Sequence, residues 1–377
     1  MGVRSRLLAE AKRAAAPNSC LEALMTERYR VAVIGCGKPR SDRGATGFGM
    51  AHSHVHGYLA TGRCELAAVA DVVPENARDF VARYGGAAKV YTDYQEMLEV
   101  ERPDIVSICT WPKLHAPMVL AAASADVRAI HCEKPMAPTW GESRAMHRAA
   151  VQKGIQLTFN HQRRFLEPFQ LARRLLREGV IGELRRMEAS CPNLFDWGTH
   201  WLDMFFFYND ETPARWVMGQ IDCREPQSIF GVPVENQALC QVRFRNDVRA
   251  LLFTGEDADI GCSNRLVGTE GIIEVHPQQP HVRVRGRGDA TWRLYETAEG
   301  LHEQVAIDRG IADLIACLEN GREPELSSHK ALRCTEVIFA TYESSRRRGR
   351  IDLPLDAEDS ALLSMLDAGE IGPSRPD

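Results

Sequence analysis

Arg30-Val31-Ala32-Val33-Ile34-Gly35-Cys36-Gly37 is the stretch that decides the fold of this 377-residue chain. Its apolar run at 31–34 shows no polar alternation, which is typical of a strand buried on both faces of a parallel sheet. Gly35 and Gly37 then end the strand in a turn. We therefore predict that the fold is built around a buried parallel strand followed directly by a glycine turn.

Residues 47–71 extend this pattern. Gly49 opens a segment with helical character that reaches about residue 61, and a second apolar run at 66–70 stops at Asp71. The glycines would let the backbone approach a pyrophosphate, the helix N-terminus offers free N–H groups, and the acid can accept from ribose hydroxyls. The order therefore predicts a dinucleotide site, although an insertion at 38–46 breaks the usual spacing. The alternative is a glycine turn that holds no cofactor.

Bulk properties narrow the class of protein. The length allows two or three domains, and the net charge of −5 gives no reason to expect nucleic acid. None of the eleven cysteines forms a C-x-x-C pair, which favours buried thiols in a reducing cytoplasm. No apolar run has the length that a membrane span needs. Residues 1–28 are expected to be an N-terminal extension with a short surface helix rather than a secretion signal.

The first half of the chain alternates strands with helices of about ten residues or more. Such alternation requires parallel strands joined by crossover helices, so residues 29–160 are predicted to form a doubly wound Rossmann domain. After the first two strands, the further strands are expected at 89–91, 105–109, 129–132 and 155–159.

The pattern changes after residue 160. Polar and apolar residues alternate, as in Gln241-Val242-Arg243-Phe244-Arg245, and few helices intervene. This alternation is typical of an antiparallel sheet with one covered face and one face open to solvent or a partner. Residues 161–371 are therefore predicted to form an α/β domain with a large, mostly antiparallel sheet, followed by a disordered tail at 372–377.

The candidate site lies beyond the carboxyl ends of the parallel strands, where ligands bind in open α/β sheets. Lys134 is a primary amine just past a strand end, and an ammonium there could donate to a substrate hydroxyl and stabilise the alkoxide. The alternative is a surface lysine before Pro135. The residues that follow the predicted strands mark the rim of the site: Gly35, Asp71, Thr110, Glu133 and Asn160.

Asp196 and His200 form a second constellation. On a helix they would stand at i and i+4, so the carboxylate could orient the imidazole and support its charged form, while the imidazole accepts a proton at neutral pH. The alternative is that Asp196 and His200 form a hydrogen-bonded pair with a purely structural role. His52 and His56 could also share a helix face, but no carboxylate or cysteine nearby completes a ligand set, so we expect helix packing and no metal.

Taken together, these motifs resemble the family of glucose–fructose oxidoreductase and inositol dehydrogenase (Gfo/Idh/MocA), over residues 29 to about 355. The ordered set is more specific than any single motif. It comprises Gly35-Cys36-Gly37 with Gly49-Met50-Ala51-His52, Asp71, the segment 110–115, Glu133-Lys134-Pro135, the segment 196–200, Gly268-Thr269-Glu270-Gly271, Tyr342-Glu343-Ser344 and Leu353-Pro354.

The resemblance implies a Rossmann domain, a second α/β domain, substrate between them, and homodimers or homotetramers formed through the open sheet face. It implies that Lys134, Asp196 and His200 are catalytic, with His200 as general base on a ring hydroxyl and Lys134 polarising the same oxygen. The cofactor would be NAD, because a 2′-phosphate would meet the carboxylate of Asp71, although Arg40 or Arg43 could permit NADP.

The resemblance also implies sets of binding residues. Asn160, Gln162, Arg164 and Thr199 are candidates for substrate hydroxyls, with interdomain hydrogen bonding as the alternative role for the first three. The segment 191–195 replaces a glycine run that many relatives carry, so the pocket could differ in shape. The cofactor-binding set is Gly35, Gly37, Gly49, His52, Asp71, Thr110, Trp111, His115, Glu133 and Lys134.

We therefore expect a cytoplasmic NAD(P)-dependent oxidoreductase that transfers a hydride between a ring hydroxyl carbon of a sugar or cyclic polyol and nicotinamide. One alternative is a glycoside-cleaving enzyme that retains NAD and oxidises a sugar carbon only transiently. The other is a non-enzymatic dinucleotide-binding regulator, which the altered phosphate loop would permit.

Overall fold

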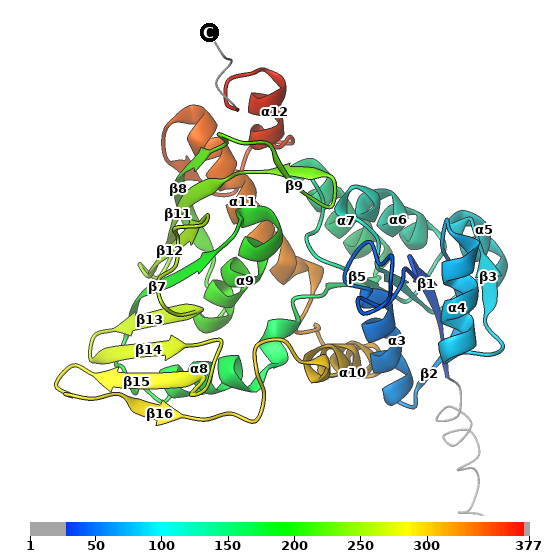
Figure 1. Cartoon of the computed structure of the whole chain (residues 1–377), viewed down its shortest axis with the longest axis horizontal. Coiled ribbons are helices and arrows are strands. Elements are labelled where there is room, and N and C mark those ends of the chain that lie inside the picture. The colour runs from blue at the N-terminus through cyan, green and yellow to red at the C-terminus, as the bar shows by residue number, and fades with distance from the viewer. Residues whose placement is uncertain (1–27, 373–377) are drawn as a thin grey trace, which may run out of the picture.

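The computed structural model describes residues 28–372, and within that range the chain forms two large sheets with helices packed on them (Figure 1). The surface helix predicted within residues 1–27 and the tail from residue 373 lie outside the described residues. No helix between residues 28 and 372 combines the length and the apolar character that crossing a membrane requires.

The first sheet has six strands in the order β3-β2-β1-β4-β5-β6, and every pair in it is parallel. Its core is apolar on both faces, because the strands carry uninterrupted runs of buried side chains. The strands are β1 (Tyr29–Ile34), β2 (Cys64–Ala70), β3 (Lys89–Tyr91), β4 (Ile105–Ile108), β5 (Ala129–Cys132) and β6 (Gln156–Phe159).

Helices cover both faces of this sheet, as Figure 1 shows on the right of the molecule. Chain order reverses between β1 and β4, and that switch point opens a crevice beyond the strands' carboxyl ends. The predicted Rossmann arrangement is therefore confirmed. The connecting helices are α3 (Met50–Ala60), α4 (Pro74–Tyr84), α5 (Tyr94–Glu101), α6 (Pro112–Ser124) and α7 (Trp140–Lys153).

The second sheet has nine strands in the order β16-β15-β14-β13-β7-β12-β11-β8-β17. Only the β7–β12 pair is parallel, so the predicted mostly antiparallel sheet is confirmed. The strands are β7 (Leu184–Cys191), β8 (Ala214–Asp222), β11 (Gln237–Phe244), β12 (Arg249–Thr254), β13 (Asn264–Gly268), β14 (Gly271–Val275), β15 (Val282–Gly286), β16 (Arg293–Tyr295) and β17 (Ile351–Asp352).

One face of this sheet is covered by helices, while the other leaves apolar side chains exposed, including Met218 and Leu239. α10 packs against α3 of the first sheet, through the apolar cluster that contains Ile307 and Ile311, and so links the two halves. The helices of this half are α8 (Glu167–Arg177), α9 (Thr199–Tyr208), α10 (Gln304–Asn320), α11 (Ser328–Arg347) and α12 (Ala361–Asp367).

Three elements that shape the site are irregular and were not predicted. A 3₁₀ turn, η1 (Gln162–Phe165), follows β6, and a π-helical turn, η2 (Leu194–Gly198), precedes α9. A small hairpin of β9 (Gln227–Ile229) and β10 (Val232–Val234) stands apart from both large sheets. These elements carry side chains from the second half of the chain toward the ends of the parallel strands.

Candidate functional site

A cavity of about 570 Å³ lies at the carboxyl ends of the parallel strands, within the size range of small-molecule sites. Both halves of the chain contribute to its wall. Gly35, Gly37 and Lys134 come from the Rossmann half, and Asp196 and His200 come from the second half. The cavity therefore joins the glycine turn to the residues that the sequence singled out for proton transfer.

The glycine turn combines a closely packed glycine with an open one. Gly35 has a φ of +85°, and a Cβ there would lie 2.7 Å from Cγ2 of Thr110. Gly37 has a φ of +56°, and a Cβ there would have nothing within 4 Å. Gly35 thus permits close packing at the strand end, while Gly37 leaves open backbone that faces the cavity.

Asp71 lies beside this turn at the end of β2. Its Oδ2 accepts a hydrogen bond from the backbone N–H of Gly37 at 2.9 Å, and its Oδ1 accepts one from Val73 at 2.8 Å. The carboxylate is 8% exposed and keeps further lone pairs for ribose hydroxyls. Gly35, Gly37 and Asp71 therefore lie together at the strand ends, and their contact with an adenine dinucleotide stays a prediction.

The insertion at 38–46 lies against the cavity, and Lys38 and Arg40 line it. The guanidinium of Arg40 stands 4.9 Å from the centroid of the Phe48 ring. Phe48 in turn meets Phe230, the tip of the β9–β10 hairpin, with ring centroids 6.1 Å apart. The insertion and the hairpin together wall one side of the cavity and place two cations in that wall.

Lys134 contacts Asp196 across the cavity, with 2.5 Å between Nζ and Oδ1. Both side chains are largely buried, at 16% and 6% exposure. Asp196 is fixed in turn, because its backbone N–H donates to Oδ1 of Asn193 at the start of η2. Asp196 therefore orients the ammonium group of Lys134, and the structure shows no hydrogen bond between Asp196 and His200 in residues 28–372.

His200 lies in the first turn of α9 and is 5% exposed. Within the described residues its Nδ1 has no hydrogen-bond partner. Burial lowers the pKa of His200 well below 6.5, and the positive groups of Arg163, Lys134, His161 and His302 lower it further. The imidazole is therefore neutral at neutral pH and able to accept a proton.

Glu133, the residue before Lys134, is held in place by buried side chains of the Rossmann half. Its Oε1 accepts from Nε2 of His54 at 2.9 Å and from Nδ2 of Asn160 at 2.7 Å, and His54 is also 2.8 Å from Ser107. Burial opposes ionisation of Glu133, but its bonds to His54 lower its pKa to about 2. Burial likewise opposes the charge on His54, yet Cys109 and Glu133 raise its pKa to about 10. This buried pair holds the strand end that carries Lys134.

Sequence reasoning missed this pair because only the fold brings His54 and Glu133 together. The one available signal was the run His52-Ser53-His54-Val55-His56, in which we weighed the two outer histidines for a metal and left His54 aside.

Other predicted binding residues lie away from the cavity. His52 contacts the hydroxyl of Tyr84 at 3.1 Å rather than lining the cavity. His115 is fully buried and bridges backbone carbonyls, including those of Thr110 and Pro135. Thr199 is buried too and pairs with His161 at 3.0 Å. None of these three residues lines the cavity, and each is held by contacts behind its walls.

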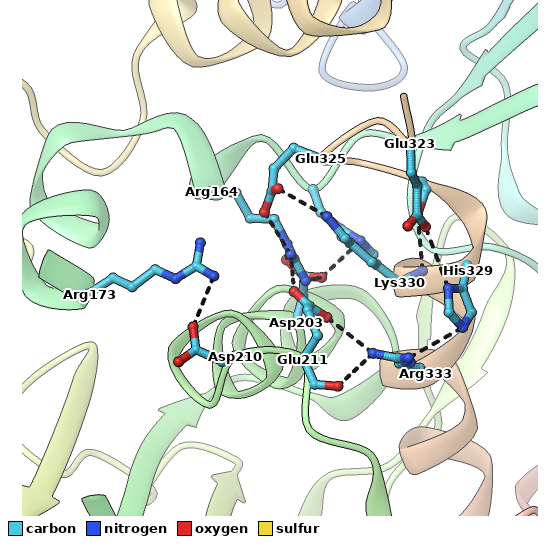
Figure 2. Close-up of polar contacts among 12 residues, drawn as sticks. Arg164, Arg173, Asp203, Asp210, Glu211, Glu323, Glu325, His329, Lys330 and Arg333 are labelled. Atoms are coloured by element: carbon cyan, nitrogen blue, oxygen red, sulfur yellow. Dashed lines mark hydrogen bonds and ion pairs between the residues drawn. The ribbon is translucent and has the colours of Figure 1, made fainter. Parts of the chain in front are cut away.

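Arg164 is also placed differently from the expectation. It has no exposed side-chain surface, and two of its nitrogens contact Asp203 at 2.8 and 2.7 Å (Figure 2). Glu325 lies 2.9 Å away and Glu211 completes the cluster. Arg164 therefore ties elements of the second half to one another, which is neither a substrate contact nor the interdomain hydrogen bonding given as its alternative role. Its neighbour Arg163 lines the cavity instead.

In the described residues, the side chains that could bind a metal are already engaged by other protein groups. His161, Asp203 and Cys334 are the group, among residues 28–372, whose donor atoms approach within 4.8 Å of one another. Arg164 already occupies both oxygens of Asp203. His56 pairs with Asp308 at 2.9 Å. We therefore assign no metal ligand.

Residues 29–161 match the model of the oxidoreductase family with an NAD-binding Rossmann fold. Over these residues, the Rossmann half of the chain matches the Gfo/Idh/MocA family. The chain is 27% identical to D-apiose dehydrogenase of Paraburkholderia graminis, over 90% of this chain and 93% of that protein. It is 26% identical to inositol 2-dehydrogenase of Burkholderia cenocepacia, over 68% and 76% of the two chains.

The structure of this chain is also similar to solved structures. Levoglucosan dehydrogenase in complex with NADH and L-sorbose superimposes with a TM-score of 0.75, at 21% identity, over 87% of this chain and 100% of that chain. This likeness confirms the fold. The family match over residues 29–161, together with the relatives named above, places the chain among enzymes of the NAD-binding oxidoreductase class.

Proposed function

We propose that this oxidoreductase uses NAD to oxidise, or NADH to form, a ring hydroxyl carbon of a sugar or cyclic polyol. The observation that carries the proposal is one cavity that contains the glycine turn, the ammonium of Lys134 and the imidazole of His200. The two proton-handling groups come from different halves of the chain. The names of the relatives, which act on apiose and inositol, agree with this substrate class.

The chain's own residues account for proton handling. His200, neutral at working pH, accepts the proton of the substrate hydroxyl, and Lys134 donates a hydrogen bond to the same oxygen as negative charge develops. Asp196 holds the ammonium group in place. Gln162 also lines the cavity, and its Oε1 has no hydrogen-bond partner within the described residues, so it is available to a further hydroxyl. A bound nicotinamide dinucleotide would supply the hydride acceptor.

We propose NAD rather than NADP as the cofactor. The carboxylate of Asp71 stands beside the glycine turn and would repel a 2′-phosphate, whereas it can accept from two ribose hydroxyls. Titration of the protein's fluorescence with both cofactors checks this choice. Tighter binding of NADP than of NAD would contradict this choice. Loss of that NADP preference in an Arg40→Gln variant would then attribute it to Arg40.

Turnover tests the proposal directly. Purified protein with NAD and a panel of sugars and cyclic polyols should form NADH, and His200→Gln should slow it by about 10² to 10⁴. The control is His56→Gln, since His56 is exposed and stands outside the cavity. Absence of NADH across the panel would refute the proposal. Glycoside cleavage without net NADH would support a transient-oxidation mechanism instead, and tight NAD binding without any turnover would support a regulator.

We further propose a homodimer or homotetramer that buries the open face of the nine-stranded sheet. Met218 and Leu239 are 50% and 45% exposed on neighbouring strands of that face, and contiguous exposed apolar surface is a feature of protein–protein interfaces. Ten cysteines of the described chain are unpaired, and this supports a reducing compartment such as the cytoplasm. We also propose domain boundaries at residues 29–160 and 161–371.

A further inference from the structure

Arg163 is a buried cation without a counter-ion. It lies in η1, is 2% exposed and lines the cavity beside His200. Its guanidinium carbon stands 3.9 Å from the ring centroid of Trp201 and 5.3 Å from that of Trp197. Among the residues that the structure describes, no carboxylate lies within 4 Å of it, and its Nε and Nη1 lack hydrogen-bond partners.

The next residue, Arg164, is a buried arginine that is fully paired with carboxylates. Arg164 is equally buried and is surrounded by Asp203, Glu211 and Glu325. Burial of an unpaired charge is costly, and the two indole rings beside Arg163 offset only part of that cost. Burial lowers the pKa of Arg163 to about 9, which reflects the same imbalance.

The charges around Arg163 do not supply the missing anion. Asp196 lines the same cavity, but it pairs with Lys134 at 2.5 Å. Glu133 is engaged by His54 and Asn160. His302 adds a further basic group to this wall of the cavity. A neutral substrate would leave the charge on Arg163 unbalanced, whereas an anionic group of the substrate would balance it.

We propose that the substrate of this site is a polyhydroxylated carboxylic acid, such as a uronic or aldonic acid, whose carboxylate is bound by Arg163. The inference rests on the proposed oxidoreductase function and narrows its substrate class. A carboxylate matches the planar, bidentate geometry of a guanidinium, and one unpaired guanidinium balances one negative charge. A sugar phosphate shares the anionic chemistry and is a separate arm of the test.

Binding of an acid would also assist His200. Arg163, Lys134, His161 and His302 all disfavour the protonated imidazole, and the carboxylates that line the cavity are Asp196, Glu133 and Glu303. A carboxylate placed on Arg163 would offset one of these positive charges, so His200 would become a stronger base when the correct substrate is present. The substrate's own charge would then promote the proton transfer.

Matched substrate pairs test the inference. With NAD present, kcat/KM is measured for D-glucuronate against D-glucose, D-galacturonate against D-galactose, and D-gluconate against D-sorbitol, with the sugar 6-phosphates alongside. We expect the acids to be preferred by about 10- to 100-fold, the worth of a charge-assisted hydrogen bond. Arg163→Gln should reduce this preference to near unity and Arg163→Lys should keep part of it. Arg185→Gln, an exposed arginine, is the control and should keep it fully.

Each result of these assays either supports or overturns the proposal of an acid substrate. NADH formation from neutral sugars or polyols with equal or higher kcat/KM would overturn the inference and leave the proposed function intact, as would a preference for sugar phosphates. An acid preference that survives Arg163→Gln would also overturn it. If no compound is turned over, the proposed function fails on its own. Quenching of tryptophan fluorescence by the acids but not by their neutral partners, in the NAD-bound wild-type protein, would still support the inference, and equal quenching would overturn it.

Discussion

Arg164→Met should destabilise the protein strongly while leaving the cofactor site assembled. The arginine has no exposed side-chain surface and bonds both oxygens of Asp203, which is itself 1% exposed. Methionine fills much of the same volume but removes the charge. Asp203 would then be a buried anion whose nearest basic neighbour is His161, 3.7 Å away.

The magnitude follows from this geometry. Breaking a buried ion pair by removing one partner costs about 3–5 kcal/mol. Glu211 and Glu325 are 22% and 28% exposed and can turn toward water, so Asp203 carries most of that cost. For a domain of this size, about 2–4 °C is lost per kcal/mol, so the melting temperature should fall by roughly 6–20 °C.

Thermal and urea unfolding, followed by circular dichroism, measure the effect. Arg177→Met is the control, because Arg177 is exposed and its loss should change stability by less than about 0.5 kcal/mol. NAD affinity of folded Arg164→Met should match that of the wild type. An unchanged melting temperature together with lost turnover would refute this reasoning and return Arg164 to the substrate site, where the sequence had placed it.

Three further predictions concern the cofactor turn, the base and the open sheet. Gly35→Ala should weaken NAD binding at least about tenfold in a fluorescence titration, because its Cβ would lie 2.7 Å from a threonine methyl at a φ of +85°; Gly86→Ala, which meets nothing within 4 Å, should not. Since the pKa of His200 is lowered, the imidazole stays neutral as pH falls, so kcat/KM should hold from about pH 7.5 down to about pH 6; an acid limb near 6.5 would contradict this. Met218→Lys with Leu239→Lys should dissociate the oligomer in light scattering without unfolding the protomer, and an unchanged mass would place the interface elsewhere.

The fold could be predicted from the sequence because its signals are local. Apolar runs such as 31–34 and the glycines that end them mark buried parallel strands, and polar alternation such as 241–245 marks the second sheet. Each signal depends on a few adjacent residues, so the insertion at 38–46 did not obscure it.

The candidate site was harder to predict, because irregular turns determine which side chains reach it. In the 3₁₀ turn η1, the side chains of consecutive residues point about 120° apart around the helix axis. Arg163 therefore lines the cavity, whereas the next residue, Arg164, points into the protein interior. In η2, the backbone N–H of Gly198 bonds to the carbonyl of Asn193 five residues earlier, so the i, i+4 alignment of Asp196 with His200 is lost.

The most direct test of the central claim is a double-variant cycle on the rate of NADH formation in a single turnover. Lys134 and His200, which line one cavity, are proposed to act on one substrate hydroxyl. Lys134→Ala and His200→Ala should then each slow the step by about 10² to 10⁴, and the double variant should be hardly slower than the worse single variant. Losses that multiply in the double variant, or a single variant with wild-type rate, would contradict it.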